Sequence, residues 1–115
     1  MSNIYPELGQ RILEMAEGDD EFRVELTSAI YTGLLELKAR YSEGTADRDE
    51  EKIQQIRHKI KPTVTMFEFD QLADSLQKGK EILDSEGFGD SFDSHFQLFL
   101  LLVDSALMEV GRLKN

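Results

Sequence analysis

The sequence predicts an all-α fold, an antiparallel four-helix bundle with an additional short N-terminal helix. Five segments repeat apolar residues at the helical period. Strand signals are nearly absent, because no run alternates apolar and polar residues and no Asn-Gly or Asp-Gly turn joins β-rich segments. Four of the segments are long and follow one another closely, which favours an up-down-up-down bundle. We expect residues 1–115 to form a single domain.

The first expected helix spans residues 6–16. Pro6 suits its first turn, because the N–H that proline lacks would be unpaired there. Its apolar stripe consists of Leu8, Ile12 and Met15. Gly18 ends the helix, since glycine readily takes the left-handed conformation that follows many helices.

The second expected helix is long and spans residues 20–41. Asp19 or Asp20 is expected to cap its N-terminus through a side-chain oxygen. Its main apolar face consists of Phe22, Leu26, Ala29, Ile30, Gly33, Leu37 and Tyr41. A thinner apolar line, which indicates a second neighbouring helix or a partner, consists of Val24, Tyr31 and Leu35. The polar residues 42–51, which include Gly44, are expected to form a loop.

The third and fourth expected helices each have one apolar face. The third spans residues 48–66, and its buried face consists of Ile53, Ile56, Ile60, Val64 and Phe67. The fourth spans residues 70–84, and its inner face consists of Phe69, Leu72, Leu76 and Leu83. Gly79 shares that inner face and is expected to allow a close helix contact, at some cost in helix propensity.

The fifth expected helix follows a loop over residues 85–90 that contains two glycines. Asp90 or Ser91 caps it, and it continues to about residue 113. Its inner face consists of Phe92, Phe96, Phe99, Val103, Leu107 and Val110. Three further residues lie off this face and either cover the first helix or form a dimer contact: Leu98, Leu101 and Leu102. We favour the first interpretation and expect a monomer.

Charge and composition exclude several classes of function. The formal net charge of −10 disfavours binding to nucleic acid, because phosphate backbones attract basic surfaces. The absence of cysteine excludes disulfides, thiolate metal sites and cysteine nucleophiles. No stretch approaches the length of apolar sequence that spans a bilayer, and no signal peptide is evident, so we expect a cytoplasmic protein with no membrane partner.

His58 lies on the outward face of the third expected helix. It is two residues from both Ile56 and Ile60, and two residues turn a helix by about 200°. The imidazole therefore points away from the core that these isoleucines define. Lys61 is three residues further on and shares the outward face, so an ammonium group lies one turn from the imidazole.

A basic patch and a proline accompany this histidine. Arg57, Lys59 and Lys61 surround His58 in a strongly acidic chain, which favours an anionic group at this place. A neutral imidazole is a nucleophile, and a phosphoryl group on its Nε2 would be flanked by positive charge. Pro62 costs the helix about 3 kcal/mol. Either this compact residue lets another protein's backbone come close, or it bends the helix around the core, and the sequence leaves both open.

The segment His58-Lys59-Ile60-Lys61-Pro62-Thr63 resembles the core motif of the histidine phosphotransfer family, a histidine followed after two residues by a lysine and then a small residue. Asp19-Asp20-Glu21-Phe22 upstream, and Phe67 and Leu72 downstream, are also similar to that family. The resemblance runs from about Leu8 into the last helix, which matches in character alone. Three positions depart from the family pattern: Arg57 for alanine, Pro62 for glycine or serine, and Glu68 for glycine.

The resemblance implies a phosphoryl carrier rather than an enzyme with its own kinase activity. His58 would accept a phosphoryl group from the aspartyl phosphate of a response-regulator receiver domain and pass it to another receiver, while Lys61 would neutralise charge on the phosphoryl oxygens. The receiver would supply Mg²⁺, so no cofactor of this chain is expected. A hybrid histidine kinase is a further candidate partner. The chain has no nucleotide-binding glycine loop, so we expect no phosphorylation from ATP.

Docking to a receiver would use the surface around His58. Candidate residues are Gln54, Gln55, Thr65 and Leu35. For the glutamines we favour the alternative interpretation as solvated surface, and Leu35 is equally interpreted as a contact with the first helix.

Two other functions compete with this prediction. A non-catalytic helical interaction module would keep its function when His58 is replaced, and a degenerate phosphotransfer scaffold is disfavoured because His58 and Lys61 are present. An independent enzyme is least favoured, since no carboxylate pair or Ser-His-Asp arrangement is evident. His95 is expected to be an incidental surface or boundary residue. The acidic runs 17–21 and 47–51 lack the spacing of a calcium loop, so they are interpreted as solvated helix starts and no metal site is expected.

Overall fold

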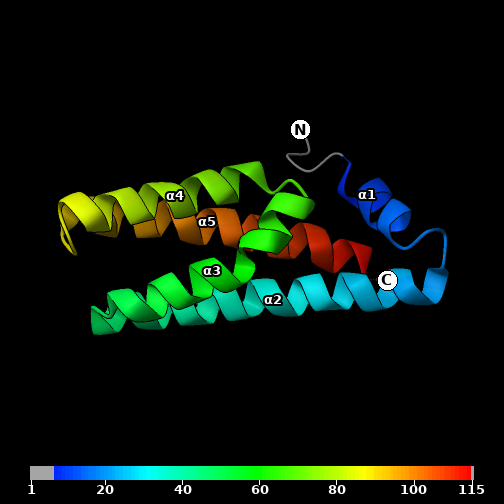
Figure 1. Ribbon diagram of the computed structural model, residues 1–115, viewed down its shortest axis with the longest axis horizontal. Coiled ribbons are helices and arrows are strands. Elements are labelled where there is room, and N and C mark those ends of the chain that lie inside the picture. The colour runs from blue at the N-terminus through cyan, green and yellow to red at the C-terminus, as the bar shows by residue number, and fades with distance from the viewer. Residues whose placement is uncertain (1–6, 115) are drawn as a thin grey trace.

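The computed structural model describes residues 7–114, which form helices and connecting turns without a strand (Figure 1). The helices are α1 (Leu8–Met15), α2 (Asp20–Asp47), α3 (Glu50–Met66), α4 (Asp70–Ser85) and α5 (Asp90–Leu113). From α2 onward, each helix runs opposite to the one before it (Figure 1). The all-α prediction is confirmed for these residues. The expected helix start at Pro6 lies outside them.

The four long helices enclose one apolar core. α2 packs against α3 and α5, and α4 packs against the same two helices, so that each long helix has two neighbours. Aromatic side chains contribute to this core: the rings of Tyr41 and Phe99 stack with their centroids 4.1 Å apart, and Phe69 and Phe92 are fully buried. α1 packs on α2, and its Gly9 lies beside Leu113 near the end of α5.

α1 and the start of α2 keep most of their predicted features. Leu8 and Ile12 are buried, but Met15 is exposed and Ala16 is buried in its place. Asp19 caps α2, because its carboxylate accepts a hydrogen bond of 3.1 Å from the backbone N–H of Phe22. Cap formation at this position is therefore confirmed.

α2 is longer than predicted, and the expected loop over residues 42–51 is wrong. The helix continues to Asp47, and the connection to α3 is reduced to Arg48 and Asp49. Gly44 is buried, and a Cβ there would lie 2.6 Å from Cγ1 of Ile53. This glycine therefore permits the close packing of α2 on α3 rather than interrupting the helix. Arg48 turns the chain with a left-handed backbone (φ 54°).

The predicted inner face of α2 is partly wrong. Phe22 and Ala29 are exposed, whereas Thr27 and Leu34 are buried with Ile30, Leu37 and Tyr41. The buried hydroxyl of Thr27 donates a hydrogen bond of 2.7 Å to the carbonyl of Arg23, so that this polar residue is tolerated in the core.

α3 and α4 carry the predicted buried faces. Ile53, Ile56, Ile60, Val64 and Phe67 are all buried, and so are Phe69, Leu72, Leu76 and Leu83. α3 begins at Glu50, two residues later than expected, because Asp49 caps it by accepting a hydrogen bond from the N–H of Lys52. The close approach at Gly79 is confirmed. A Cβ at that position would lie 2.5 Å from Nε2 of His95 and 2.5 Å from the hydroxyl oxygen of Tyr41.

α5 differs from the prediction at its start and on its outer face. Gly89 occupies the cap position without a side-chain hydrogen bond, and Ser91 donates instead to Glu86. Leu98 and Leu101 are exposed, so they do not cover α1, while Leu102 is half-buried. Within residues 7–114, no helix combines the length and apolarity that crossing a membrane requires.

Candidate functional site

His58 projects from the outer face of α3 into solvent. The buried face of this helix repeats at Ile53, Ile56 and Ile60, so the position two residues from the last two faces outward. His58 and Lys61 are both exposed, as the helical spacing predicted. The backbone of α3 therefore holds an imidazole and an ammonium group on one outward surface.

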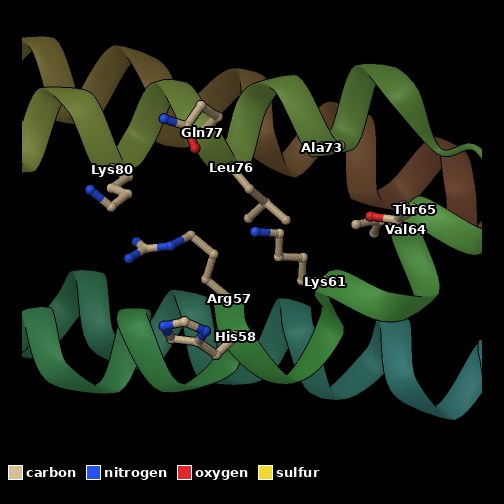
Figure 2. A pocket seen from close by; sticks show the side chains of 9 residues that line it. All are labelled: Arg57, His58, Lys61, Val64, Thr65, Ala73, Leu76, Gln77 and Lys80. Carbon is tan, nitrogen blue, oxygen red and sulfur yellow. The ribbon is translucent and has the colours of Figure 1, made fainter.

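A hollow of about 190 Å³ lies beside this surface, between α3 and α4. α3 lines it with Arg57, His58, Lys61, Val64 and Thr65. α4 lines it with Ala73, Leu76, Gln77 and Lys80. Figure 2 shows the side chains of Arg57 and Lys61 extending from α3 toward α4, with the imidazole of His58 on the α3 side. The hollow thus has an apolar floor and a rim with three cationic side chains and one imidazole.

Two of these cations lack a counter-ion. The chain has 23 acidic and 13 basic residues, so a basic side chain is rarely far from a carboxylate. Among the described residues, every lysine and arginine except Arg57, Lys61 and Lys78 forms an ion pair or lies over an aromatic ring. Lys80, the third cation at the hollow, pairs with Asp84 at 2.9 Å. Two cations without an ion-pair partner therefore lie beside His58, and the nearby carboxylates of Glu50 and Asp84 line the adjoining depression with Arg57.

Lys59 does not contribute positive charge to the hollow, so the basic cluster beside His58 contains fewer residues than predicted. Its ammonium group lies 2.9 Å from the carboxylate of Glu36 on α2, on the other side of α3. Successive residues of a helix point about 100° apart, so Arg57 and Lys59 lie on opposite sides of His58. Arg57 faces α4, and Lys59 faces α2. The positive charge at the hollow comes from Arg57 and Lys61.

Pro62 lies inside α3 and is exposed. Proline has no N–H, so residue 62 cannot donate the helical hydrogen bond to the carbonyl of His58, four residues before it. The C-terminal part of α3 turns away from α2 toward α4 (Figure 1). This bend places Thr65 at the same hollow as His58 and Lys61. Of the two interpretations of Pro62, the structure bears out the bend and leaves the docking role as a prediction.

The other candidate docking residues are spread around α3. Gln55 and Lys59 line a groove between α2 and α3, whereas Gln54 lines a small depression with Arg57 and Lys80. Leu35 on α2 is exposed, so it does not pack on α1. The structure brings together His58, Arg57, Lys61 and Thr65, and it does not bring Gln55 or Lys59 to the same hollow.

The contribution of α4 to the hollow was not predicted from the sequence. Ala73, Gln77 and Lys80 follow one another at spacings of four and three residues, on the flank of the buried Leu72–Leu76 stripe. That spacing identifies one face of a helix. It does not identify which neighbouring helix the face meets, so this face could not be paired with His58 from the spacing alone.

The second histidine is a core residue, and its predicted surface role is wrong. His95 is 6% exposed, and its Nε2 shares a hydrogen bond of 2.7 Å with the hydroxyl of Tyr41. Burial lowers the pKa of His95 below its ordinary value, because the interior disfavours the imidazolium. Burial also raises the pKa of the Tyr41 phenol. Both side chains are therefore held in their neutral forms, and His58 is the only histidine exposed to a partner.

Within residues 7–114, no three histidine or acidic side chains are grouped so that they could hold a metal ion. A comparison of the chain with family models, with curated proteins and with solved structures found no match.

Proposed function

We propose that this protein is a histidine-containing phosphotransfer domain, an antiparallel four-helix bundle that carries a phosphoryl group on His58 between receiver domains. The observation that carries the proposal is the exposed imidazole at the rim of a hollow where Arg57 and Lys61 have no counter-ion. A surface histidine alone is weak support for a function. An exposed nucleophile beside uncompensated cations, in a chain of net charge −10, favours chemistry on an anionic group.

The transfer that we propose is a direct displacement. The lone pair of Nε2 of His58 forms the N–P bond while the P–O bond to the aspartate of the receiver breaks, and the carboxylate leaves with the electron pair. The proton on Nδ1 stays, so the product is a phosphoimidazolium and a free carboxylate. Charge on the three phosphoryl oxygens during this step is stabilised by nearby cations, which is the role proposed for Lys61. Mg²⁺, where it is needed, would be bound by the receiver.

The surroundings of His58 suit a partner that approaches from outside. Exposed residues of α3 frame the imidazole, among them Gln54, Gln55 and Thr65. We assign them, with Pro62, to the docking surface, where polar groups that stay hydrated in the free protein can bond to a partner.

The experiment that tests the proposal is transfer from a receiver. Purified protein is mixed with a labelled, phosphorylated receiver domain from the same genome and Mg²⁺. We expect label that is labile in acid and stable in base on the wild type, and none on a His58→Gln variant. Lys61→Ala should slow the transfer, whereas Lys78→Ala should not. Lys78 is a matched control because it is also a lysine without a counter-ion, but it lies away from the hollow.

The opposite result has a defined meaning. If no receiver labels the wild type, or if His58→Gln is labelled equally, the phosphotransfer proposal is wrong. The exposed side chains of Leu98, Leu101 and Met108 on α5 would then favour an interaction module that binds partner helices without phosphotransfer.

A further inference from the structure

Arg57 is unusual among the basic residues of this chain because it is half-buried and forms no ion pair. Lys61 and Lys78, the other two cations without a partner among the described residues, are exposed. Arg57 has lost part of its exposed surface without forming an ion pair, whereas charged side chains that leave water are normally paired. An anionic ligand in the hollow would supply the missing partner.

The position of Arg57 suits a ligand attached to His58. Both residues line the hollow between α3 and α4, and Lys61 lines it from the next turn of the same helix. Figure 2 shows the Arg57 side chain extending from α3 toward Lys80 on α4, along the hollow that His58 also lines. Lys80 is less available because Asp84 neutralises it, with 2.9 Å between the two groups.

The chemistry of arginine matches that of a phosphoryl group. Its planar guanidinium has several N–H donors in a fixed arrangement, and it can donate two parallel hydrogen bonds to two oxygens of one phosphoryl group. A lysine ammonium interacts as a point charge and gives no such orientation. Arg57 and Lys61 together would contact the phosphoryl oxygens from two sides.

We propose that Arg57 is a second phosphoryl-binding residue, which binds the oxygens of phosphorylated His58 and shifts the transfer equilibrium toward this protein. The proposal rests on the proposed phosphotransfer function and adds to it a thermodynamic role. An interaction that is present in the phosphorylated form and absent from the unphosphorylated one stabilises the former, whichever receiver is the donor. Arg57 would thereby favour, at equilibrium, the phosphoryl group on His58 over the phosphoryl group on the receiver.

The equilibrium constant between the free proteins tests this role. The phosphorylated receiver is incubated with wild type, Arg57→Ala, Arg57→Lys or Lys78→Ala protein until the distribution of phosphoryl stops changing. We expect Arg57→Ala to lower the fraction on His58, with a fall in the equilibrium constant of roughly two- to fivefold, the size of a partly solvated ion pair. Arg57→Lys should fall between Arg57→Ala and wild type, and Lys78→Ala should match wild type. Thermal melts check that all variants fold.

A second measurement is made on this protein alone, after His58 has been phosphorylated and the receiver removed. The Nε–H resonance of Arg57 is compared in 15N spectra of the isolated protein with and without phosphoryl on His58. We expect the resonance to shift and its exchange with water to slow on phosphorylation, because the N–H gains an anionic acceptor. A role in folding alone would not move this signal.

Three results would overturn the inference, and they differ from one another. Equal falls in the forward and reverse rates of Arg57→Ala, with an unchanged equilibrium constant, would mean that Arg57 contacts the receiver instead. An unmoved Nε–H resonance in fully phosphorylated protein would mean that the guanidinium does not bind the phosphoryl group. Absence of any phosphoryl on wild-type His58 would remove the proposed function, and this inference with it.

Discussion

Gly79 lies where α4 meets the side chains of Tyr41 and His95, and no other residue has room there. We predict that Gly79→Ala destabilises the protein by about 1–3 kcal/mol, because the added methyl overpacks a buried contact. The measurement is the free energy of unfolding in urea. Gly33→Ala is the matched control, since Gly33 is also inside a helix but a Cβ there would lie 3.5 Å from Ile60, an ordinary contact. The control should be neutral or stabilising by up to about 1 kcal/mol.

His95 gives the folded state a dependence on pH. Burial lowers its pKa from the ordinary value of 6.5, so the unfolded chain binds a proton more readily than the folded one. The stability that neutral His95 contributes is complete above pH 6.5 and is lost as the pH falls below that value toward the lowered pKa. We predict that the free energy of unfolding decreases over this interval in the wild type and in His58→Gln, and less in His95→Phe. Equal slopes in all three would contradict the assignment.

At the scale of the helices, Pro62 sets the shape of α3. We predict that Pro62→Ala stabilises the protein by on the order of 1–3 kcal/mol, because it restores a donor to the carbonyl of His58 and removes a clash in the helix. The same change should slow transfer from a receiver, since a straighter α3 would carry Thr65 away from the hollow that contains His58. Unfolding in denaturant and the transfer assay measure the two effects. A variant that is less stable and transfers normally would refute this account.

The elements differ in how far the sequence could predict them. The stripe of α3 was predictable because Ile53, Ile56, Ile60 and Val64 repeat without interruption, and all four are buried. The end of α2 was not predictable, because a glycine such as Gly44 usually indicates the end of a helix. Gly44 packs against Ile53, and this contact depends on the position of α3 in the tertiary structure. Local propensity is a weak guide where a neighbouring helix requires a small residue.

The candidate site could also be predicted only in part from the sequence. The outward direction of His58 and Lys61 follows from helical spacing and was predicted. The neutralisation of Lys59 by Glu36 and the contribution of Lys80 depend on which helices are neighbours, and neither was predicted. His95 was missed because a single polar residue near the start of a helix resembles a surface residue, and its partner Tyr41 is 54 residues away in the chain.

For the protein as a whole, net charge and exposed apolar groups have opposite effects on self-association. Leu98, Leu101 and Met108 leave an apolar line on the outside of α5, which favours association. The net charge of −10 opposes the approach of a second copy. A stable interface also needs about 20 residues on each side, far more than this line provides.

We therefore predict that the protein is a monomer of 13.2 kDa in sedimentation equilibrium at moderate salt, and that Leu101→Glu leaves the mass unchanged. A wild type that sediments as a dimer, together with a Leu101→Glu variant that sediments as a monomer, would show that α5 is a self-association surface.

The hydrogen bond between Tyr41 and His95 also provides the molecule with an optical signal. The chain has no tryptophan, so tyrosine dominates its near-ultraviolet absorption. Burial raises the pKa of Tyr41, so this phenol stays un-ionised in the folded protein under alkaline conditions that ionise it in an unfolded chain. Unfolding at alkaline pH therefore converts Tyr41 to tyrosinate, and the accompanying rise in absorbance reports, without a label, the opening of the point where α2, α4 and α5 meet.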